Sequence, residues 1–372
     1  MGTHKKLNYI HVFRAIAIII IVAGHCFNSN QEILKTFLNL ILKDGTVLFV
    51  FIAGFLFQYL SDNFSYPIYL KKKFFNVVLP YIFTSVFGIV ALLFSIKPNP
   101  FIDVNKIIQI GMFLTTGLIH NLPTWYIPMT CVFFLFAAIL LKLEKKIVFN
   151  KYSLLFVILP ILICLSCFLP RYETYYFVTK DMTALQAYVG CLEKILFQTI
   201  LFFPVYILGM FFAKYKDIAI KNLWQKRLML WGIFIVTLII NFLLSYYNLL
   251  PGRLLLPKIV LTLLILGYLY HYDEKIILHS QINNALGIVA DYSFAIFFLH
   301  YYFAVGFNEI FEHLFHWKDM YLSAQNFHFS FWLVFTGLRF IIALFGSLFV
   351  TMLIKKILEK FGVKHTRYFI GA

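Results

Sequence analysis

The chain has 372 residues, of which 62% are hydrophobic and 20% aromatic, while only 13% carry a charge. A soluble domain of this length needs far more charged surface, so the composition excludes a soluble globular protein and predicts a polytopic membrane protein. Lysine and arginine outnumber aspartate and glutamate by 32 to 16, which gives a net charge of +16. Because the basic residues are not interleaved with aromatic ones on a polar surface, we expect membrane lipid and not nucleic acid as their partner.

Apolar runs long enough to cross a hydrocarbon layer of about 30 Å recur along the whole chain. The stretch 101–119 is also apolar but contains Asp103 and Lys106, so we expect an interfacial or re-entrant piece there. No Gly/Ser-rich linker or acidic tract divides the chain, which predicts a single integral membrane domain over residues 1–372. The fold class we expect is an all-α polytopic membrane protein of about ten transmembrane helices, at roughly 9–28, 45–61, 75–96, 123–141, 152–169, 196–213, 228–247, 254–271, 286–307 and 331–354.

The distribution of basic residues predicts the orientation. With the amino terminus in the cytoplasm, the inside segments hold about twice as many lysines and arginines as the outside loops, in agreement with the positive-inside rule. An even number of helices then places both termini in the cytoplasm. The first apolar run has no small-residue cleavage site after it, so we expect a retained first helix in a multi-pass protein of the cell (cytoplasmic) membrane.

Two polar residues in the first span, Arg14 and His25, are the most informative feature of the sequence. At about 100° per residue their spacing brings both side chains to nearly the same helix face, about 16 Å apart along the axis. Polar groups at membrane depth are costly unless they face protein or water, so the pair predicts a functional site. The alternative is that Arg14 extends to the lipid headgroups and His25 caps the far end of the helix.

Patterns of soluble enzymes are absent: the sequence has no GxSxG, no phosphate-binding glycine loop, no HExxH and no paired metal-ligand spacing. We therefore expect no metal and no bound cofactor. The five cysteines are odd in number and lie mostly in apolar runs, so we expect no disulfide framework, and we interpret Cys164-x-x-Cys167 as helix packing. A neutral histidine can act as a general base, and an arginine binds phosphate or carboxylate with its planar fork. Together they suit a reaction that binds an anionic carrier and deprotonates a hydroxyl.

Six stretches form an ordered set of motifs along the chain. They are Arg14-AIAIIIIVAG-His25, GTVLFVFIAGFLF at 45–57, LKKKFFNVVLPY at 70–81, Trp125-Tyr126, Tyr206-ILG-Met210 and Ser293-FAIFFLH, which ends at His300. This set resembles the acyltransferase-3 family of integral membrane acyltransferases, which O-acylate carbohydrates and related acceptors. Ala53 stands where the family usually has serine, and Lys73 and Asn76 stand where it often has two arginines. Neither the hydroxyl nor the second charge is therefore carried over.

The resemblance implies a membrane O-acyltransferase with acyl-CoA, by default acetyl-CoA, as its cytoplasmic co-substrate. The acyl group would pass to a hydroxyl of a surface or lipid-linked glycan. His25 would act as the base or as a relay that carries the acyl group, and Arg14 would bind the donor. Lys72 and Lys73 would contact the donor phosphates, although a basic segment here also fits ordinary topology. Direct transfer and a covalent intermediate both remain open.

Four further residues are candidates for contact with the acceptor: Trp125, Tyr126, His300 and Arg339. The two adjacent aromatic residues also fit an interfacial belt, and the histidine also fits core packing or an interfacial anchor. Arg339 has no acid at its depth in the sequence, which favours a position facing a cavity.

A transporter or exporter of a glycan or anionic metabolite is the main rival class. Against it, the sequence shows no internal repeat and no pair of broken helices in matching positions. A non-catalytic scaffold would have no reason to hold Arg14 and His25 on one face. Association into a homo-oligomer is left open.

Overall fold

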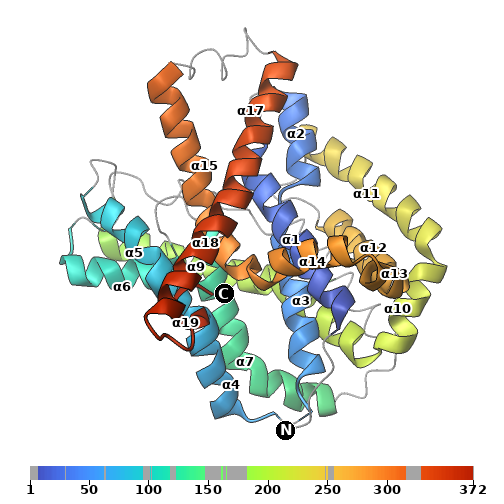
Figure 1. Ribbon diagram of the computed structural model, residues 1–372. Helices are drawn as coiled ribbons and strands as arrows, with labels where there is room; N and C mark the ends of the chain where they lie inside the picture. The colour runs from blue at the N-terminus through green and yellow to red at the C-terminus, as the bar shows by residue number, and fades with distance from the viewer. Residues whose placement is uncertain are drawn as a thin grey trace. The chain divides into compact units, whose positions relative to one another are not determined.

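The computed structural model describes residues 7–29, 31–62, 64–94, 101, 103–117, 123–146, 161, 165, 182–247, 249, 255–315 and 328–371. Within these ranges the regular structure is entirely helical, without a β-strand (Figure 1). The fold class expected from composition, an all-α polytopic membrane protein, is thereby confirmed.

Eight helices of the described residues are long and apolar enough to cross a membrane, and each overlaps one predicted span. The prediction at 254–271 corresponds to α12 (Leu256–His271), an apolar helix shorter than the other eight. The prediction at 152–169 lies outside the described residues, as does Cys164-x-x-Cys167. The eight candidate spans are Asn8–Cys26, Glu32–Tyr59, Tyr66–Phe94, Tyr126–Glu144, Ala184–Lys214, Arg227–Tyr246, Ser293–Leu314 and Phe329–Lys360.

The chain divides into two compact units. The first contains residues 1–63 and 205–356, and the second contains residues 64–204 and 357–372. Two helices run from one unit into the other, α9 (Ala184–Lys214), with Pro204 at the boundary, and α18 (Ser347–Lys360). The prediction of one functional membrane domain over 1–372 stays a prediction.

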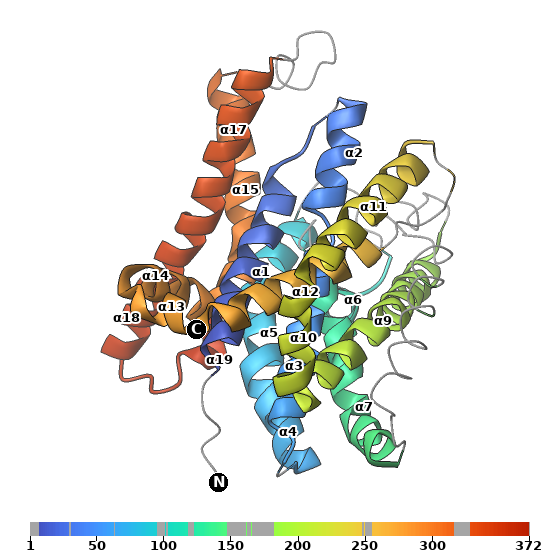
Figure 2. The ribbon, with the colours of Figure 1, turned by 90° about the vertical axis from the view of Figure 1, so that its right-hand side faces the viewer.

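In the first unit, α1 (Asn8–Cys26) is a central helix whose residues are apolar on nearly every side, as a helix buried in protein requires. It packs against helices of both ends of the chain, and Figure 2 shows α15 and α17 running side by side next to it. Its neighbours are α3 (Thr46–Tyr59), α12, α13 (Asp273–Leu278), α14 (Ser280–Asp291), α15 (Ser293–Phe315), α17 (Phe329–Ile341) and the π-helical turn η3 (Ile342–Gly346).

Around α12 pack α10 (Lys216–Gln225) and α11 (Arg227–Tyr246), and α2 (Glu32–Ile41) contacts α11. Lys258 of α12 is buried and donates a hydrogen bond to the carbonyl oxygen of Ile41, the last residue of α2. A cation at a helix carboxyl terminus is favourable because the last carbonyl oxygens lack partners within the helix. Lys258 therefore ties α12 to the carboxyl-terminal end of α2.

The helix predicted at 286–307 begins later than the sequence suggested. α14 ends at Asp291, α15 begins at Ser293, and the helices are separated at Tyr292. The Ser293 hydroxyl donates to the carbonyl oxygen of Ala290 at 2.8 Å, which ties the first residue of α15 to the last turn of α14. Asp291 thus ends α14, a helix of 12 residues, and is not part of the membrane-length one.

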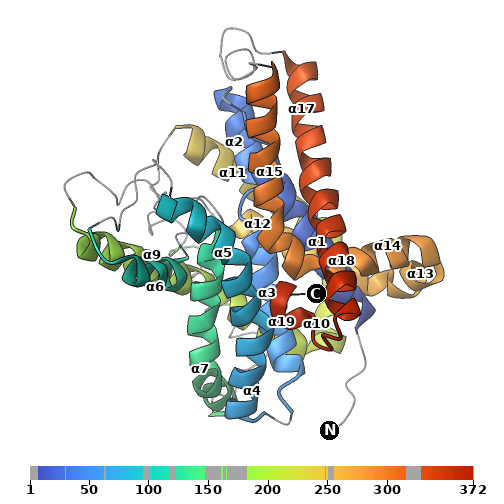
Figure 3. The ribbon, with the colours of Figure 1, turned by 60° about the vertical axis from the view of Figure 1, so that its left-hand side comes forward.

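The second unit contains α4 (Tyr66–Lys73), the π-helical turn η1 (Phe74–Val78), α5 (Leu79–Phe94), α6 (Lys106–Thr116), the 3₁₀ turn η2 (Pro123–Trp125), α7 (Tyr126–Lys146), the first part of α9 and α19 (Arg367–Ile370) (Figure 3). The hydroxyl of Tyr66 donates to Leu135 and that of Tyr81 donates to Leu114, so both tyrosines tie neighbouring helices together. α6 has 11 residues and a length of about 16 Å, too short to cross a bilayer. It fits the interfacial or re-entrant piece expected at 101–119.

Candidate active site

Arg14 and His25 both turn toward α15, as the helical spacing predicted. Arg14 Nη2 donates to the Ser293 hydroxyl at 3.0 Å, at the beginning of α15. The ring of His25 lies 5.2 Å, between centroids, from that of His300 on the same helix. Ser293 and His300 are two helical turns apart, so they share one face of α15. The alternative positions, Arg14 at the headgroups and His25 as a terminal cap, do not fit these interhelical contacts.

Three elements surround the ring of His25. His300 and Tyr301 of α15 contact it through their rings, at 5.2 and 5.7 Å between centroids. Lys43, from the turn between α2 and α3, and Arg339, from α17, both act electrostatically on it. The charged groups acting on His25 within the described residues are therefore cations. Such an environment attracts negative charge, including that of a thioester oxygen during acyl transfer.

Gly24 explains how the turn carrying Lys43 comes close to His25. A Cβ atom at this position would lie 2.8 Å from the carbonyl oxygen of Leu42. Real Cβ atoms essentially never come so close to a backbone atom, so the approach of the turn to α1 requires glycine. The absence of a side chain at Gly24 thus allows the turn that carries Lys43 to lie close to His25.

Two side chains of α17 hold the carboxyl-terminal end of α1. Arg339 is 8% exposed and donates to the carbonyl oxygens of Cys26 and Ala304, each at 3.3 Å. The indole of Trp332 donates to the carbonyl oxygen of Asn28 at 2.7 Å. The bonds to Cys26 and Asn28 satisfy carbonyl groups at and just after the end of α1, and they fix the backbone that follows His25. Arg339 therefore binds backbone, a partner that its sequence position did not reveal.

Arg339→Gln is expected to lower the free energy of unfolding by about 1–3 kcal/mol, because it leaves buried carbonyl oxygens without a charged donor. Arg339→Lys keeps the charge but not the fork, so its loss should be smaller. Thermal unfolding in detergent, compared with the exposed Lys360→Ala, measures the difference. Equal melting temperatures for all three variants would show that Arg339 does not hold the end of α1.

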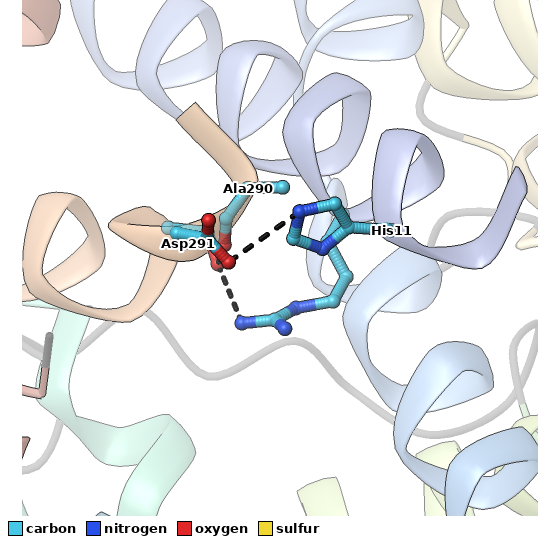
Figure 4. A network of polar contacts seen from close by, with 5 residues as sticks. His11, Ala290 and Asp291 are labelled. Atoms are coloured by element: carbon cyan, nitrogen blue, oxygen red, sulfur yellow. Dashed lines mark hydrogen bonds and ion pairs between the residues drawn. The ribbon is translucent and has the colours of Figure 1, made fainter. Parts of the chain in front are cut away.

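The amino-terminal half of α1 forms a second polar cluster with the junction of α14 and α15. The hydroxyl of Ser293 accepts from Arg14 and donates to Ala290, so the guanidinium is connected to the end of α14. His11, one turn before Arg14, is buried and lies 3.4 Å from a carboxylate oxygen of Asp291, which is 63% exposed. Figure 4 shows the His11 ring directed toward Asp291 beside Ala290. The cluster positions Arg14 and joins the most polar part of α1 to the helix that carries His300.

Four predicted site residues, Lys72, Lys73, Trp125 and Tyr126, belong to the second unit, where aromatic rings surround Lys73 and Trp125. Lys72 is exposed, whereas Lys73 is partly buried, with its ammonium group 4.8 Å from the ring centroid of Phe134 and 5.3 Å from that of Tyr69. The ring of Trp125 lies 6.1 Å, between centroids, from that of Phe202 and is tilted by 31° to it, and Tyr126 is buried. The aromatic partners give both Lys73 and Trp125 a packing role within this unit. Any contact of these four residues with substrate stays a prediction.

Sequence reasoning missed the direct pairing of His25 with His300, and it missed Ser293 and Lys43 as neighbours of the two principal residues. One signal was present: Ser293 and His300 are seven residues apart, the spacing of one helix face. That Ser293 and His300 face α1 could not be predicted, because it depends on packing between helices far apart in the chain.

The fold and the site define a multi-pass helical membrane protein in which Arg14 and His25 of α1 contact α15. The family model Acyl_transf_3, described as an acyltransferase domain, matches residues 7–356, nearly the whole chain, and the chain belongs to this family. The resemblance seen in the motifs is thus confirmed, as is the general class of membrane acyltransferase. Searches among curated proteins and among solved structures found no match.

Proposed function

We propose that the protein is an O-acyltransferase of the cell membrane, which moves an acyl group, acetyl in the first instance, from cytoplasmic acyl-CoA to a hydroxyl of a surface or lipid-linked glycan. The observation that carries the proposal is the placement of Arg14 and His25 on one side of α1 against α15. Membership of an acyltransferase family supports an enzyme over a transporter. No bound cofactor is needed, because the activated acyl group arrives on the donor.

In this reaction His25 removes the proton of the acceptor hydroxyl as its oxygen attacks the thioester carbonyl. The carbon–sulfur bond then breaks, and the proton passes from His25 to the sulfur of the leaving coenzyme A. The cations Lys43 and Arg339 favour the negative charge that develops on the carbonyl oxygen. A relay in which His25 carries the acyl group for part of the reaction uses the same residues.

Donor binding is assigned to Arg14 in this proposal, because a guanidinium remains charged and presents parallel donors to phosphate or carboxylate oxygens. Lys72 and Lys73 are proposed as further contacts of the donor phosphates. Trp125, Tyr126, His300 and Arg339 are the proposed acceptor contacts of lowest specificity. Of the first three, Trp125 is the ring that is not buried, and it is of the kind that stacks on sugars.

The test uses membrane vesicles from cells in which the gene has been deleted and then restored. Vesicles receive acetyl-CoA labelled in the acetyl group, and the label in alkali-labile products is counted, because O-esters are cleaved by mild alkali. We expect labelled ester only with the restored gene. Absence of labelled ester in both preparations would contradict acetyl transfer, and labelled ester in both would assign the activity to another protein.

Arg14→Ala is expected to raise the KM for acetyl-CoA by about tenfold or more, since it removes a charged hydrogen-bonding partner of the donor. Arg14→Lys should retain part of the affinity, because the charge stays while the fork is lost. Initial rates over a range of acetyl-CoA concentrations separate KM from the maximal rate. An unchanged KM in Arg14→Ala would remove Arg14 from donor binding.

A further inference from the structure

His300 is a buried ring with one nitrogen bound and the other without a partner among the residues that the structure describes. Its side chain is 0% exposed, and Nδ1 lies 2.9 Å from the carbonyl oxygen of Ile296, one turn earlier in α15. A carbonyl oxygen only accepts, so Nδ1 carries the hydrogen and Nε2 of the neutral ring has a free lone pair. Among the described residues, Nε2 has no hydrogen-bond partner. Such a buried acceptor is costly, and a functional partner accounts for its presence.

The ring of His25 is at the right separation to be that partner. The two centroids are 5.2 Å apart, with the planes inclined by 49°. Two imidazoles joined edge to edge by one N–H···N bond have centroids roughly 5 Å apart, given a donor–acceptor distance of about 3 Å and a ring radius of about 1.1 Å. A rotation of the His25 ring is therefore enough to form the bond. Hydrogen bonds of catalytic groups often become short only when substrate is bound.

The charges around His25 make this acceptor important. Lys43 comes from the turn between α2 and α3, Arg339 comes from α17, and His300 and Tyr301 come from α15. No carboxylate belongs to this set of described residues. When His25 takes a proton, it becomes a cation among cations, and an acceptor at His300 Nε2 stabilises that cation by a charge-assisted hydrogen bond.

We propose that His300 is a positioning residue for His25: its Nε2 accepts a hydrogen bond from one nitrogen of His25, which leaves the other nitrogen to take the proton of the acceptor hydroxyl. This inference rests on the proposed function of His25 as the base. The proton passes from the hydroxyl to His25 and then to the thiolate of the leaving coenzyme A, while His300 ends the reaction unchanged. Lys43 and Arg339 prevent both rings from being protonated together, so the pair holds one extra proton at a time.

Two substitutions separate the acceptor role of His300 from its packing role. The amide nitrogen of His300→Asn can replace Nδ1 as the donor to Ile296, but this variant has no acceptor in place of Nε2. The longer side chain of His300→Gln can place an oxygen near the position of Nε2. In the vesicle assay we expect the maximal rate to fall about 100-fold in His300→Asn and at most about tenfold in His300→Gln, with little change in the KM for acetyl-CoA. The exposed His313→Ala on the same helix is the control and should retain the wild-type rate.

The dependence of the rate on pH distinguishes this role from a merely structural one. An acceptor at Nε2 stabilises protonated His25, so its removal makes His25 harder to protonate. Rate is lost as pH falls and the base becomes protonated. The acidic limb of the profile should therefore move to lower pH in His300→Asn and stay near its wild-type position in His300→Gln. Loss of packing alone would lower the rate without moving this limb.

Equal rates in the Asn and Gln variants, or an unmoved acidic limb in His300→Asn, would overturn the proposal. If the Asn variant does not fold, nitrogen NMR spectra of histidine-labelled wild-type protein test the proposal instead, with the His300 signals assigned by comparison with His300→Gln. A hydrogen on Nε2 of neutral His300 would then overturn the proposal. Failure of the proposed function of His25 as the base gives a different result. In that case His25→Ala itself would transfer acetyl at the wild-type rate.

Discussion

His25→Ala is expected to abolish acetyl transfer, with a loss of about 10²–10⁴-fold, because the reaction loses the group that removes the hydroxyl proton. The measurement is the rate of formation of alkali-labile labelled ester in vesicles at saturating acetyl-CoA. The KM for acetyl-CoA should change little, since donor binding is assigned to Arg14.

The folded state of His25→Ala should remain close to that of the wild type. The imidazole makes ring contacts to His300 and Tyr301, but the end of α1 is held through backbone oxygens by Arg339 and Trp332, which the substitution leaves in place. Melting in detergent and the yield of monodisperse protein check this. The matched control is His313→Ala, which removes an exposed histidine from α15. Wild-type turnover in folded His25→Ala protein would end the assignment of His25 as the base or relay.

Much of the fold could be predicted from the sequence, because the requirement for long apolar helices acts locally along the chain. The runs of apolar residues predicted the positions of all eight candidate spans among the described residues. The break at Tyr292 was missed, although Asp291 and Ser293 are residue types that favour helix ends. An apolar run continues on both sides of this break, and hydropathy alone averages across it.

The candidate site likewise has one part that the sequence predicts and another that it does not. The shared face of Arg14 and His25 follows from the period of a single helix and could be predicted. Their partners on α15 could not, because the Arg14–Ser293 contact joins residues 279 positions apart and depends on how α1 packs. Arg339 shows the same limit: a sequence reveals a cation within a span, but not that backbone oxygens of two other helices are what it binds.

Gly54→Ala and Gly209→Ala are each expected to destabilise the first unit by about 3 kcal/mol or more. These residues lie where α3 and the second part of α9 approach backbone to backbone. A Cβ atom would lie 2.0 Å from the carbonyl oxygen of Tyr206 at Gly54, and 2.1 Å from that of Phe51 at Gly209. Neither obstacle is a flexible side chain, so the helices must separate, and overpacking of this kind usually costs about 1–3 kcal/mol even where side chains can move. Close approach of helix backbones through small residues is a common form of packing in membrane proteins.

Thermal unfolding in detergent and the fraction of monodisperse protein measure this loss. The control is Gly232→Ala on α11, where a Cβ atom would meet nothing within 4 Å. Alanine favours a helix interior over glycine by about 1 kcal/mol in water, so the control should be neutral or slightly stabilised. Both sensitive glycines belong to motifs of the family resemblance, 45–57 and Tyr206-ILG-Met210. If Gly54→Ala and Gly209→Ala melt like Gly232→Ala, the close crossing of α3 and α9 is wrong, and the two motifs are adjacent for some reason other than this contact.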